Sequence, residues 1–174
     1  FVIFHKAIRN PSWFLQSADN YAHLAYITRS VQSGIYSMLH AAFYTGARPE
    51  LQTPFFDEGF YPNAFHSFAA VATAITGLNE ALTENVVWFV SVAVIYPVGI
   101  CALLQTIGKK NLVASVLTSF VVFAQLAFPL RMVTVHAVFP NVMGFCAVPS
   151  AVVLFILMLN GAVPDKNDSA VEQL

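Results

Sequence analysis

The sequence predicts an all-α, polytopic helical membrane protein with three full spans and with juxtamembrane or interfacial helices in a large outer loop. Hydrophobic residues make up 57% of the 174-residue chain, and charged residues only 10%. A soluble domain carries about 25% charged residues, so this chain has too few charges to cover a surface exposed to water. Three apolar stretches also approach the ~20 residues that cross a ~30 Å hydrocarbon core.

The three predicted spans cover residues 84–107, 111–131 and 136–160. Prolines interrupt all of them, and each proline leaves a backbone carbonyl without its usual helical partner. In lipid such a carbonyl must be satisfied by neighbouring groups or by water. We therefore expect bent helices that pack in a larger bundle. The prolines concerned are Pro97, Pro129, Pro140 and Pro149.

The only paired basic residues of the sequence, Lys109 and Lys110, lie between the first two predicted spans. The positive-inside rule places them in the cytoplasm. Residues 84–161 then form a three-helix transmembrane region of a bacterial plasma membrane, with residues 10–83 as an outer loop. The polar residues 162–174 become a cytoplasmic tail.

Residues 1–9 are apolar but too short to span, so we interpret them as the end of a truncated transmembrane helix. This interpretation predicts that the chain is an N-terminal fragment of a larger protein. The alternative is a chain that ends near Leu174 and serves as a subunit beside a larger membrane protein.

Two helices are predicted within the outer loop. Residues 19–39 have an amphipathic pattern that suits a membrane interface, and Gly34 is expected to weaken and shorten this helix. After Pro62, the stretch "NAFHSFAAVATAITGL" predicts a helix of about 15 residues, which is short for a span and is therefore interpreted as interfacial or half-inserted. The apolar stripe of the first helix is Leu24, Ile27, Val31, Ile35 and Met38, and its polar stripe is Asp19, His23, Tyr26 and Ser30.

Asp19 and His23 are four residues apart, so their side chains can meet on one face of a helix. An acid can hold a histidine in its charged or correctly oriented form, and both side chains can bind a metal ion. The alternative is a helix N-terminus, where Asp19 is favourable as a cap and through the helix dipole. Spacing alone leaves both interpretations open.

Four further residues are candidates, each with a structural alternative. Asp57 and Glu58 lie between aromatic residues and can bind a divalent cation or take a proton from a hydroxyl, or they are simply solvated. His66 is either a ligand or an interfacial histidine at the start of the second helix. Arg131, before the third span, either holds a lipid phosphate or anchors the chain by snorkelling.

Several classes of function have no support in the sequence. The chain has no basic patch, which excludes a nucleic-acid partner. It contains no nucleophile elbow, P-loop, zincin or Cys-x-x-Cys pattern, so the soluble catalytic classes are set aside. A transporter is disfavoured because no predicted span carries an acid or a lysine at mid-membrane.

Four stretches together resemble an actinobacterial polytopic membrane family of unknown function. They are "ADNYAHLAYITRSVQSG", "GFYPNAFHSFAAVATAITG", "YPVGICALLQTI" and "FPLRMVTVHAVFPNVMGFCAVPSAVVLF", and the resemblance covers roughly residues 15–160. That family in turn resembles the GT-C class of integral-membrane glycosyltransferases. These enzymes use a lipid-phosphate-linked sugar as donor and carry catalytic acids in their first external loop.

The resemblance implies roles for the candidate residues. Asp19 would be the base that acts on an acceptor hydroxyl, and Asp57 or Glu58 would assist or bind a divalent cation. The usual Asp-x-Asp pair is absent, because "ADNYAH" contains one acid, so the metal ligands stay unassigned. The substrate-binding residues implied by this layout are His23, Arg29, Tyr61, His66 and Arg131.

The implied function is transfer of a sugar from a polyprenyl-phosphate donor to a cell-envelope acceptor. The expected partners are the lipid bilayer, the lipid-linked sugar, and either the remainder of a larger protein or a partner membrane subunit. The alternative is a non-catalytic membrane subunit or a lipid-binding module of an envelope-assembly complex.

Overall fold

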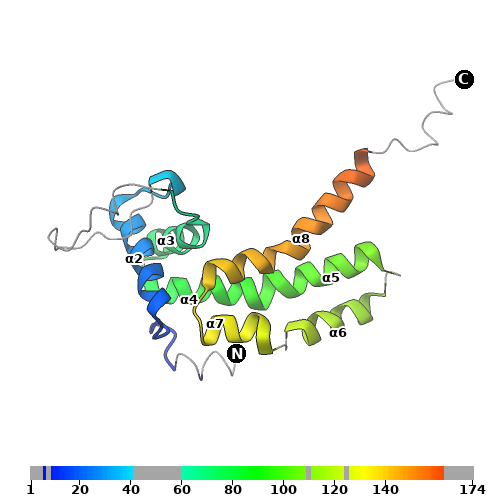
Figure 1. Cartoon of the computed structure of the whole chain (residues 1–174), viewed down its shortest axis with the longest axis horizontal. Helices are drawn as coiled ribbons and strands as arrows, with labels where there is room; N and C mark the ends of the chain where they lie inside the picture. The colour runs from blue at the N-terminus through cyan, green and yellow to red at the C-terminus, as the bar shows by residue number, and fades with distance from the viewer. Residues whose placement is uncertain (1–5, 7–8, 41–59, 109–110, 124–125, 163–174) are drawn as a thin grey trace, which may run out of the picture.

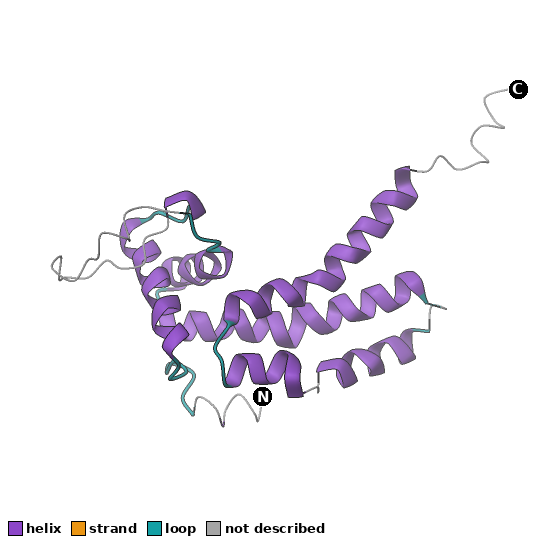
Figure 2. Cartoon of the chain, viewed as in Figure 1, coloured by secondary structure: helices purple, strands orange, loops and turns teal. Residues whose placement is uncertain are grey.

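The computed structural model describes residues 6, 9–40, 60–108, 111–123 and 126–162. Over these residues the chain is helical, with loops and turns and no strand (Figure 2). The long helices form an elongated bundle, and two shorter helices, α2 (Ala18–Ser33) and α3 (Ala64–Thr76), pack at one end of it (Figure 1). The predicted all-α class is therefore confirmed for the described residues.

The first long helix is built from α4 (Glu80–Val90), the π-helical segment η4 (Ser91–Ile95) and α5 (Tyr96–Ile107). It begins at Asn79, whose side chain accepts a hydrogen bond from the backbone N–H of Leu82. The wider η4 turn precedes Pro97, which lacks the N–H that an ordinary helical turn would use. The whole element, Glu80–Ile107, is long and apolar enough to cross a membrane, and it starts four residues before the predicted span.

The last long helix is α8 (Phe139–Ala162), which begins three residues later than predicted. Its residues Phe139–Gly161 are also long and apolar enough to cross a membrane. The helix lies along α5 near its start and leans away from it toward the C-terminus (Figure 1). Large apolar side chains stay exposed along it, among them Phe145, Leu154, Phe155, Leu157 and Met158.

The predicted span over residues 111–131 is not one continuous helix. Helix α6 covers Leu112–Phe123, and the π-helical segment η5 (Leu126–Arg131) and the short α7 (Met132–Thr134) follow. Phe128 inside η5 has extended backbone angles, φ −133° and ψ 134°, as expected for a residue that precedes a proline. The described residues therefore contain two helices of spanning length, and the predicted third span is not confirmed.

Helix α2 is shorter than the predicted helix over residues 19–39. It ends where Gly34 adopts φ 68° and gives its N–H to the carbonyl of Ser30, so Ile35 lies beyond it. Glycine takes this left-handed conformation without the Cβ penalty of other residues. A short 3-10 turn, η1 (Met38–His40), follows.

The buried face of α2 differs from the predicted one. His23 and Ser30 belong to the predicted polar stripe, and the structure buries both against the protein. Asn20 and Ile27 complete this face, at the alternating steps of three and four that one side of a helix requires. Asn20 and His23 therefore contact other helices, whereas Asp19 on the same helix is exposed.

The hydrophobic core lies where α3, α4, α7 and α8 meet. Trp88 and Phe139 are stacked, with ring centroids 5.9 Å apart and planes 11° apart, and Phe65 packs against Phe139. Each large apolar side chain buried in this way contributes about 1.5–3 kcal/mol. Helix α3 also contacts α4 through a hydrogen bond of 2.6 Å between Thr73 and Thr83. This core fixes the positions of the side chains that surround the candidate site.

The structure does not test the predicted membrane orientation. The assignments of residues 10–83 to the outer side and of residues 162–174 to a cytoplasmic tail stay predictions. The same holds for the truncated helix predicted over residues 1–9, most of which lie outside the described residues.

Candidate functional site

A pocket of about 300 Å³ lies at the end of the bundle where α2 crosses the start of α8. This volume is at the lower end of the range for small-molecule sites, about 300–1,000 Å³. We call it the Asp19 pocket. Its lining comes from the first turns of α2, the segment before α3 and the start of α8: Asp19, Ala22, His23, Tyr61, Pro62, Val138, Pro140 and Asn141.

Asp19 is an exposed residue in the first turn of α2. The N-cap position is Ser17, which makes no side-chain capping hydrogen bond, so Asp19 is not the cap of this helix. A carboxylate in the first turn is still favoured by the helix dipole. Its charge also acts on two other pocket residues: it partly opposes the lowering of the His23 pKa by burial, and it adds to the raising of the Tyr61 pKa by burial.

His23 uses both of its ring nitrogens inside the protein. Nε2 lies 3.0 Å from the carbonyl oxygen of Ala137, and Nδ1 lies 3.0 Å from Nε2 of His66. A carbonyl only accepts, so His23 Nε2 carries a hydrogen and donates it. In the neutral ring, Nδ1 is then an acceptor for the N–H of His66. Contact between His23 and Asp19 is therefore electrostatic, since no ring nitrogen is left for a hydrogen bond.

His66 is fully buried behind the pocket, where it is hydrogen-bonded to His23 and its ring contacts that of Tyr61. Burial and the neighbouring His23 together lower the pKa of His66 to about 3. The carbonyl of Asn63 opposes this effect, although Nδ1 of His66 makes no hydrogen bond of ordinary geometry. His66 is therefore neutral at physiological pH, and its Nε2–H fixes the ring of His23.

The pKa of His23 is also lowered, chiefly by burial. Its hydrogen bond to Ala137 and the charge of Asp19 act in the opposite direction. Ala137 is itself unusual, because it is a buried non-glycine residue with φ 53°. This left-handed conformation costs roughly 1–2 kcal/mol for a residue with a Cβ, and it places the Ala137 carbonyl within reach of His23.

Two stacked tyrosines form one wall beside the pocket. The rings of Tyr26 and Tyr61 have centroids 4.3 Å apart and planes 14° apart. The backbone N–H of Tyr61 binds the carbonyl of Met38, which ties the segment before α3 to η1. Burial raises the pKa of both tyrosines, so their hydroxyls stay protonated and can donate hydrogen bonds at neutral pH.

Not all predicted site residues meet at this pocket. Arg29 is half-buried on α2 and does not line it, and Arg131 is exposed at the end of η5. Asp57 and Glu58 lie outside the described residues. Of the predicted residues, Asp19, His23 and Tyr61 therefore line the pocket, and His66 supports it from behind.

Three polar residues near the site were not predicted from the sequence. Asn141 lines the pocket, and Asn20 and Glu84 are fully buried where α2 crosses α4. Asn20 shares a helix face with His23 because the two are three residues apart. Glu84 had a signal too, since it is an acid followed by the apolar run "NVVWFVSVAVI".

A second cavity lies within the apolar part of the bundle and has a volume of about 430 Å³. It lies between α5, the η5–α7 segment and α8, and we call it the apolar groove. Its lining is Tyr96, Ile100, Phe128, Met132, Phe145, Val148 and Pro149.

No metal centre is evident in the described part of the chain. Among those residues, no group of three or more His, Cys, Asp or Glu side chains is arranged to hold a metal ion. The predicted divalent cation depends on Asp57 and Glu58, so it stays a prediction.

Comparison with known proteins gives a family but no activity. Neither a curated protein nor a solved structure matches the chain. The resemblance to GT-C glycosyltransferases and the actinobacterial origin therefore stay predictions. One family model matches residues 1–171, which is nearly the whole chain. The chain therefore belongs to this family, which is described as a family of unknown function (DUF6541).

Proposed function

We propose that this chain is the membrane part of a GT-C-like glycosyltransferase, which moves a sugar from a polyprenyl-phosphate donor to a cell-envelope acceptor. One observation supports the proposal above the others. Asp19 and His23 come from α2 and Tyr61 from the segment before α3, and all three line one pocket at the end of the long apolar helices. Convergent polar groups in a single pocket are typical of binding and catalytic sites.

The two long helices support a membrane location. Both have the length and composition to cross a bilayer, and many of their large side chains are exposed. The core helix of a soluble protein would bury such side chains, whereas lipid accepts them without cost. The Asp19 pocket then lies at one end of the bundle, where a polar acceptor and a lipid-linked donor can meet.

The charge of the pocket favours the acceptor over the phosphate group. Its lining contains one carboxylate, a tyrosine hydroxyl and the Asn141 amide, and it contains no Lys or Arg. A carboxylate repels a phosphate but accepts a hydrogen bond from a hydroxyl. We therefore assign this pocket to the acceptor hydroxyl, and Arg29 and Arg131 remain the candidates for the donor phosphate.

In the proposed reaction Asp19 accepts the proton of the acceptor hydroxyl. The acceptor oxygen forms a bond to the anomeric carbon while the bond from that carbon to the phosphate oxygen breaks. The electron pair leaves with the polyprenyl phosphate, which needs little help from an acid. Tyr61 orients the acceptor by a hydrogen bond, and His23, held by His66 and Ala137, keeps its wall of the pocket rigid.

The test is Asp19→Asn in the full-length protein, because asparagine keeps the shape and removes the base. General-base catalysis contributes about 10²–10⁴-fold, so we expect transfer of labelled sugar to fall at least 100-fold. Glu80→Gln, an acid on α4 that does not line the pocket, is the matched control and should leave transfer unchanged. Unchanged transfer by a correctly folded Asp19→Asn variant would remove Asp19 from the mechanism.

A second candidate function is a lipid-binding module without catalysis. The apolar groove favours it, because a hydrocarbon chain fits a groove with an almost wholly apolar lining. Met132→Trp should fill the groove and weaken binding of polyprenyl phosphate. If the wild-type protein binds this lipid but transfers no sugar, even with its natural partner subunits, the lipid-binding function replaces the transferase.

A further inference from the structure

Glu84 is the most unusual buried group in the described structure. It lies one turn into α4, its side chain is 0% exposed, and neither carboxyl oxygen has a hydrogen-bond partner. Ion pairs are absent as well, since none of the described Lys or Arg side chains contacts it. A carboxylate in such a place would lose its hydration without any compensation, which is among the most expensive arrangements in a protein.

Asn20 of α2 is the side chain that interacts with Glu84. It is also 0% exposed. Its Nδ2 donates to the carbonyl of Leu15 at 3.0 Å, but its Oδ1 has no partner. The pair therefore contains three buried oxygens without a hydrogen-bond donor: two from Glu84 and one from Asn20.

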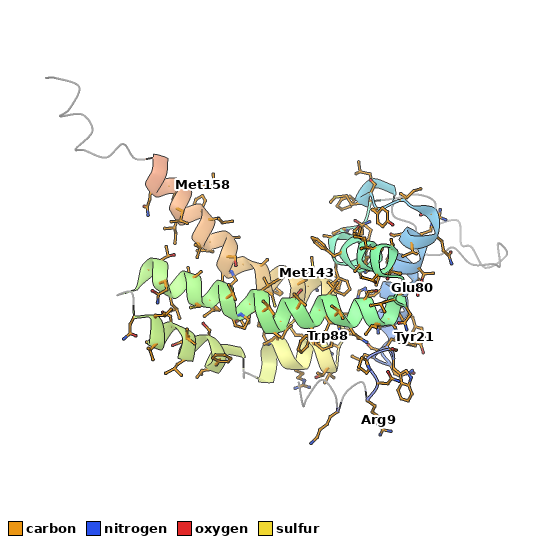
Figure 3. All side chains as sticks on the ribbon, turned by 180° about the vertical axis from the view of Figure 1, so that it is seen from behind. Arg9, Tyr21, Glu80, Trp88, Met143 and Met158 are labelled. Atoms are coloured by element: carbon orange, nitrogen blue, oxygen red, sulfur yellow. The ribbon has the colours of Figure 1, made fainter. Side chains whose placement is uncertain are left out.

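The neighbouring segments cover the junction of α2 and α4, where Asn20 meets Glu84. Asn85 donates to the carbonyls of Pro11 and Trp13, at 2.8 and 2.6 Å, so the coil before α2 covers the start of α4. Figure 3 shows Tyr21 and Glu80 at the same end of the bundle, where α2 crosses α4. The junction is therefore shut off from solvent on the side of the coil.

The titratable groups around the junction offer Glu84 no compensating charge. On α2, Asp19 is exposed and His23 is fully hydrogen-bonded. On α3, His66 is neutral and bound to His23, and on α4 itself Glu80 has the same charge as Glu84 would have. Helix α8 packs on this region through apolar residues such as Phe139 and has no charged residue.

We propose that Glu84 is a proton-binding site, in which the neutral carboxyl donates its hydrogen to Oδ1 of Asn20 and thereby docks α2 onto α4. The hydrogen count leads to this assignment. Asn20 uses one of its two N–H hydrogens on Leu15, and the second can serve an oxygen of Glu84. Oδ1 of Asn20 cannot be served by its own amide, so within the pair its only possible donor is a hydrogen carried by Glu84. A single proton then satisfies an oxygen on each side chain and removes the buried charge.

The proton has a consequence for the Asp19 pocket. Asn20 lies next to Asp19 in the sequence and on the same helix face as His23, so α2 positions all three together. Loss of the proton removes the donor to Oδ1 of Asn20 and leaves a fully buried charge, and the cost of that desolvated charge separates α2 from α4. The pocket is therefore assembled in the protonated state and disrupted in the deprotonated state. This inference does not depend on whether the pocket transfers sugar.

Infrared spectroscopy of the full-length protein in detergent or nanodiscs tests the proposal directly. An exposed glutamate has a pKa of about 4.3, so at pH 7 we expect the carbonyl stretch of a protonated carboxyl in the wild type and in Glu80→Gln. Glu84→Gln should lack this band. Raising the pH to alkaline values should abolish the band in both the wild type and Glu80→Gln. Absence of any protonated carboxyl in folded wild-type protein at pH 7 would overturn the proposal.

Two further measurements test the partner and the docking. In Asn20→Leu the band should persist but shift to higher frequency, because the hydroxyl loses its acceptor, and an unshifted band would disprove Asn20 as the acceptor. Hydrogen exchange of residues 18–33, corrected for the intrinsic effect of pH, should rise in the wild type as the band disappears. Glu84→Gln should keep these amides protected, and identical exchange in both proteins at every pH would exclude the docking role.

Discussion

His23 and His66 are joined by a hydrogen bond of 3.0 Å between Nδ1 and Nε2, and the two residues are 43 positions apart in the sequence. His23 comes from α2 and His66 from the first turn of α3. The other ring nitrogen of His23, Nε2, donates a hydrogen bond to the carbonyl of Ala137, just before α8. One imidazole thus connects three segments around the Asp19 pocket, and its orientation is set on both sides.

The histidine pair makes a testable contribution to stability. In His66→Leu the buried Nδ1 of His23 loses its donor, and an unsatisfied buried polar group costs about 1–3 kcal/mol. We expect a corresponding loss in the free energy of unfolding in detergent. His66→Gln should recover part of it, since its amide N–H can reach the same acceptor. The exposed His136→Leu is the control, and it should change stability by no more than about 0.5 kcal/mol.

The buried histidines also predict how stability depends on pH. The pKa of His66 is about 3 in the folded protein and that of His23 is lowered as well, against about 6.5 for an unfolded histidine. Below pH 6.5 the unfolded chain therefore binds more protons than the folded one, so stability falls as the pH falls. The stability contributed by the neutral histidines is complete above pH 6.5. It declines toward pH 3, by up to about 1.4 kcal/mol per pH unit for each histidine.

The measurement is the free energy of unfolding from pH 7.5 to 4. His66→Gln removes one of the two titrating groups, so its curve should be flatter than that of the wild type over this range. A wild-type curve that stays level between pH 6.5 and 4 would contradict the assignment of a neutral, buried pair.

Local signals in the sequence were sufficient to predict part of the fold. The apolar runs of residues 84–107 and 136–160 predicted the long helices, because hydropathy over about 20 residues is a local property. Gly34 indicated where α2 ends. The break near Phe128 and Pro129 was visible as a proline inside an apolar run, but apolar composition alone does not distinguish a continuous span from a broken one.

The candidate site was only partly predictable. The layout of Asp19, His23 and Tyr61 pointed to one region, and the structure brings them to one pocket. The contact of His23 with Ala137 spans 114 positions and depends on how α2 packs against the start of α8. Hydrophobic periodicity predicted a polar stripe on α2, but it could not predict which side chains of that stripe another helix buries, because that depends on tertiary packing.

The end of α2 offers a prediction about the backbone. Gly34 has φ 68°, and a Cβ added there meets no atom within 4 Å. Gly34→Ala therefore creates no clash, and its whole cost is the left-handed conformation, about 1 kcal/mol. Gly34→Asn should cost less, because asparagine tolerates this conformation better. Thermal unfolding checks both variants, and equal stability of Gly34→Ala and the wild type would show that α2 ends differently.

Close packing of the two long helices depends on Gly99. A Cβ on this residue would lie 2.7 Å from Oγ of Ser150, 3.2 Å from the Ser150 backbone nitrogen and 3.3 Å from Cβ of Pro149. Small residues let helices approach this closely in membranes, where packing replaces the hydrophobic driving force. Gly99→Ala should therefore destabilise the α5–α8 contact by about 1–3 kcal/mol, the usual cost of overpacking.

A double-mutant cycle separates the two parts of this clash. Ser150→Ala removes the hydroxyl, so in combination with Gly99→Ala it should recover the cost of the 2.7 Å contact. The cost from the backbone nitrogen should remain, because the backbone of α8 cannot rotate away as a side chain can. Gly161→Ala, at a helical glycine with open space around it, is the matched control. Additive effects of Gly99→Ala and Ser150→Ala would mean that α5 and α8 do not approach each other at these residues.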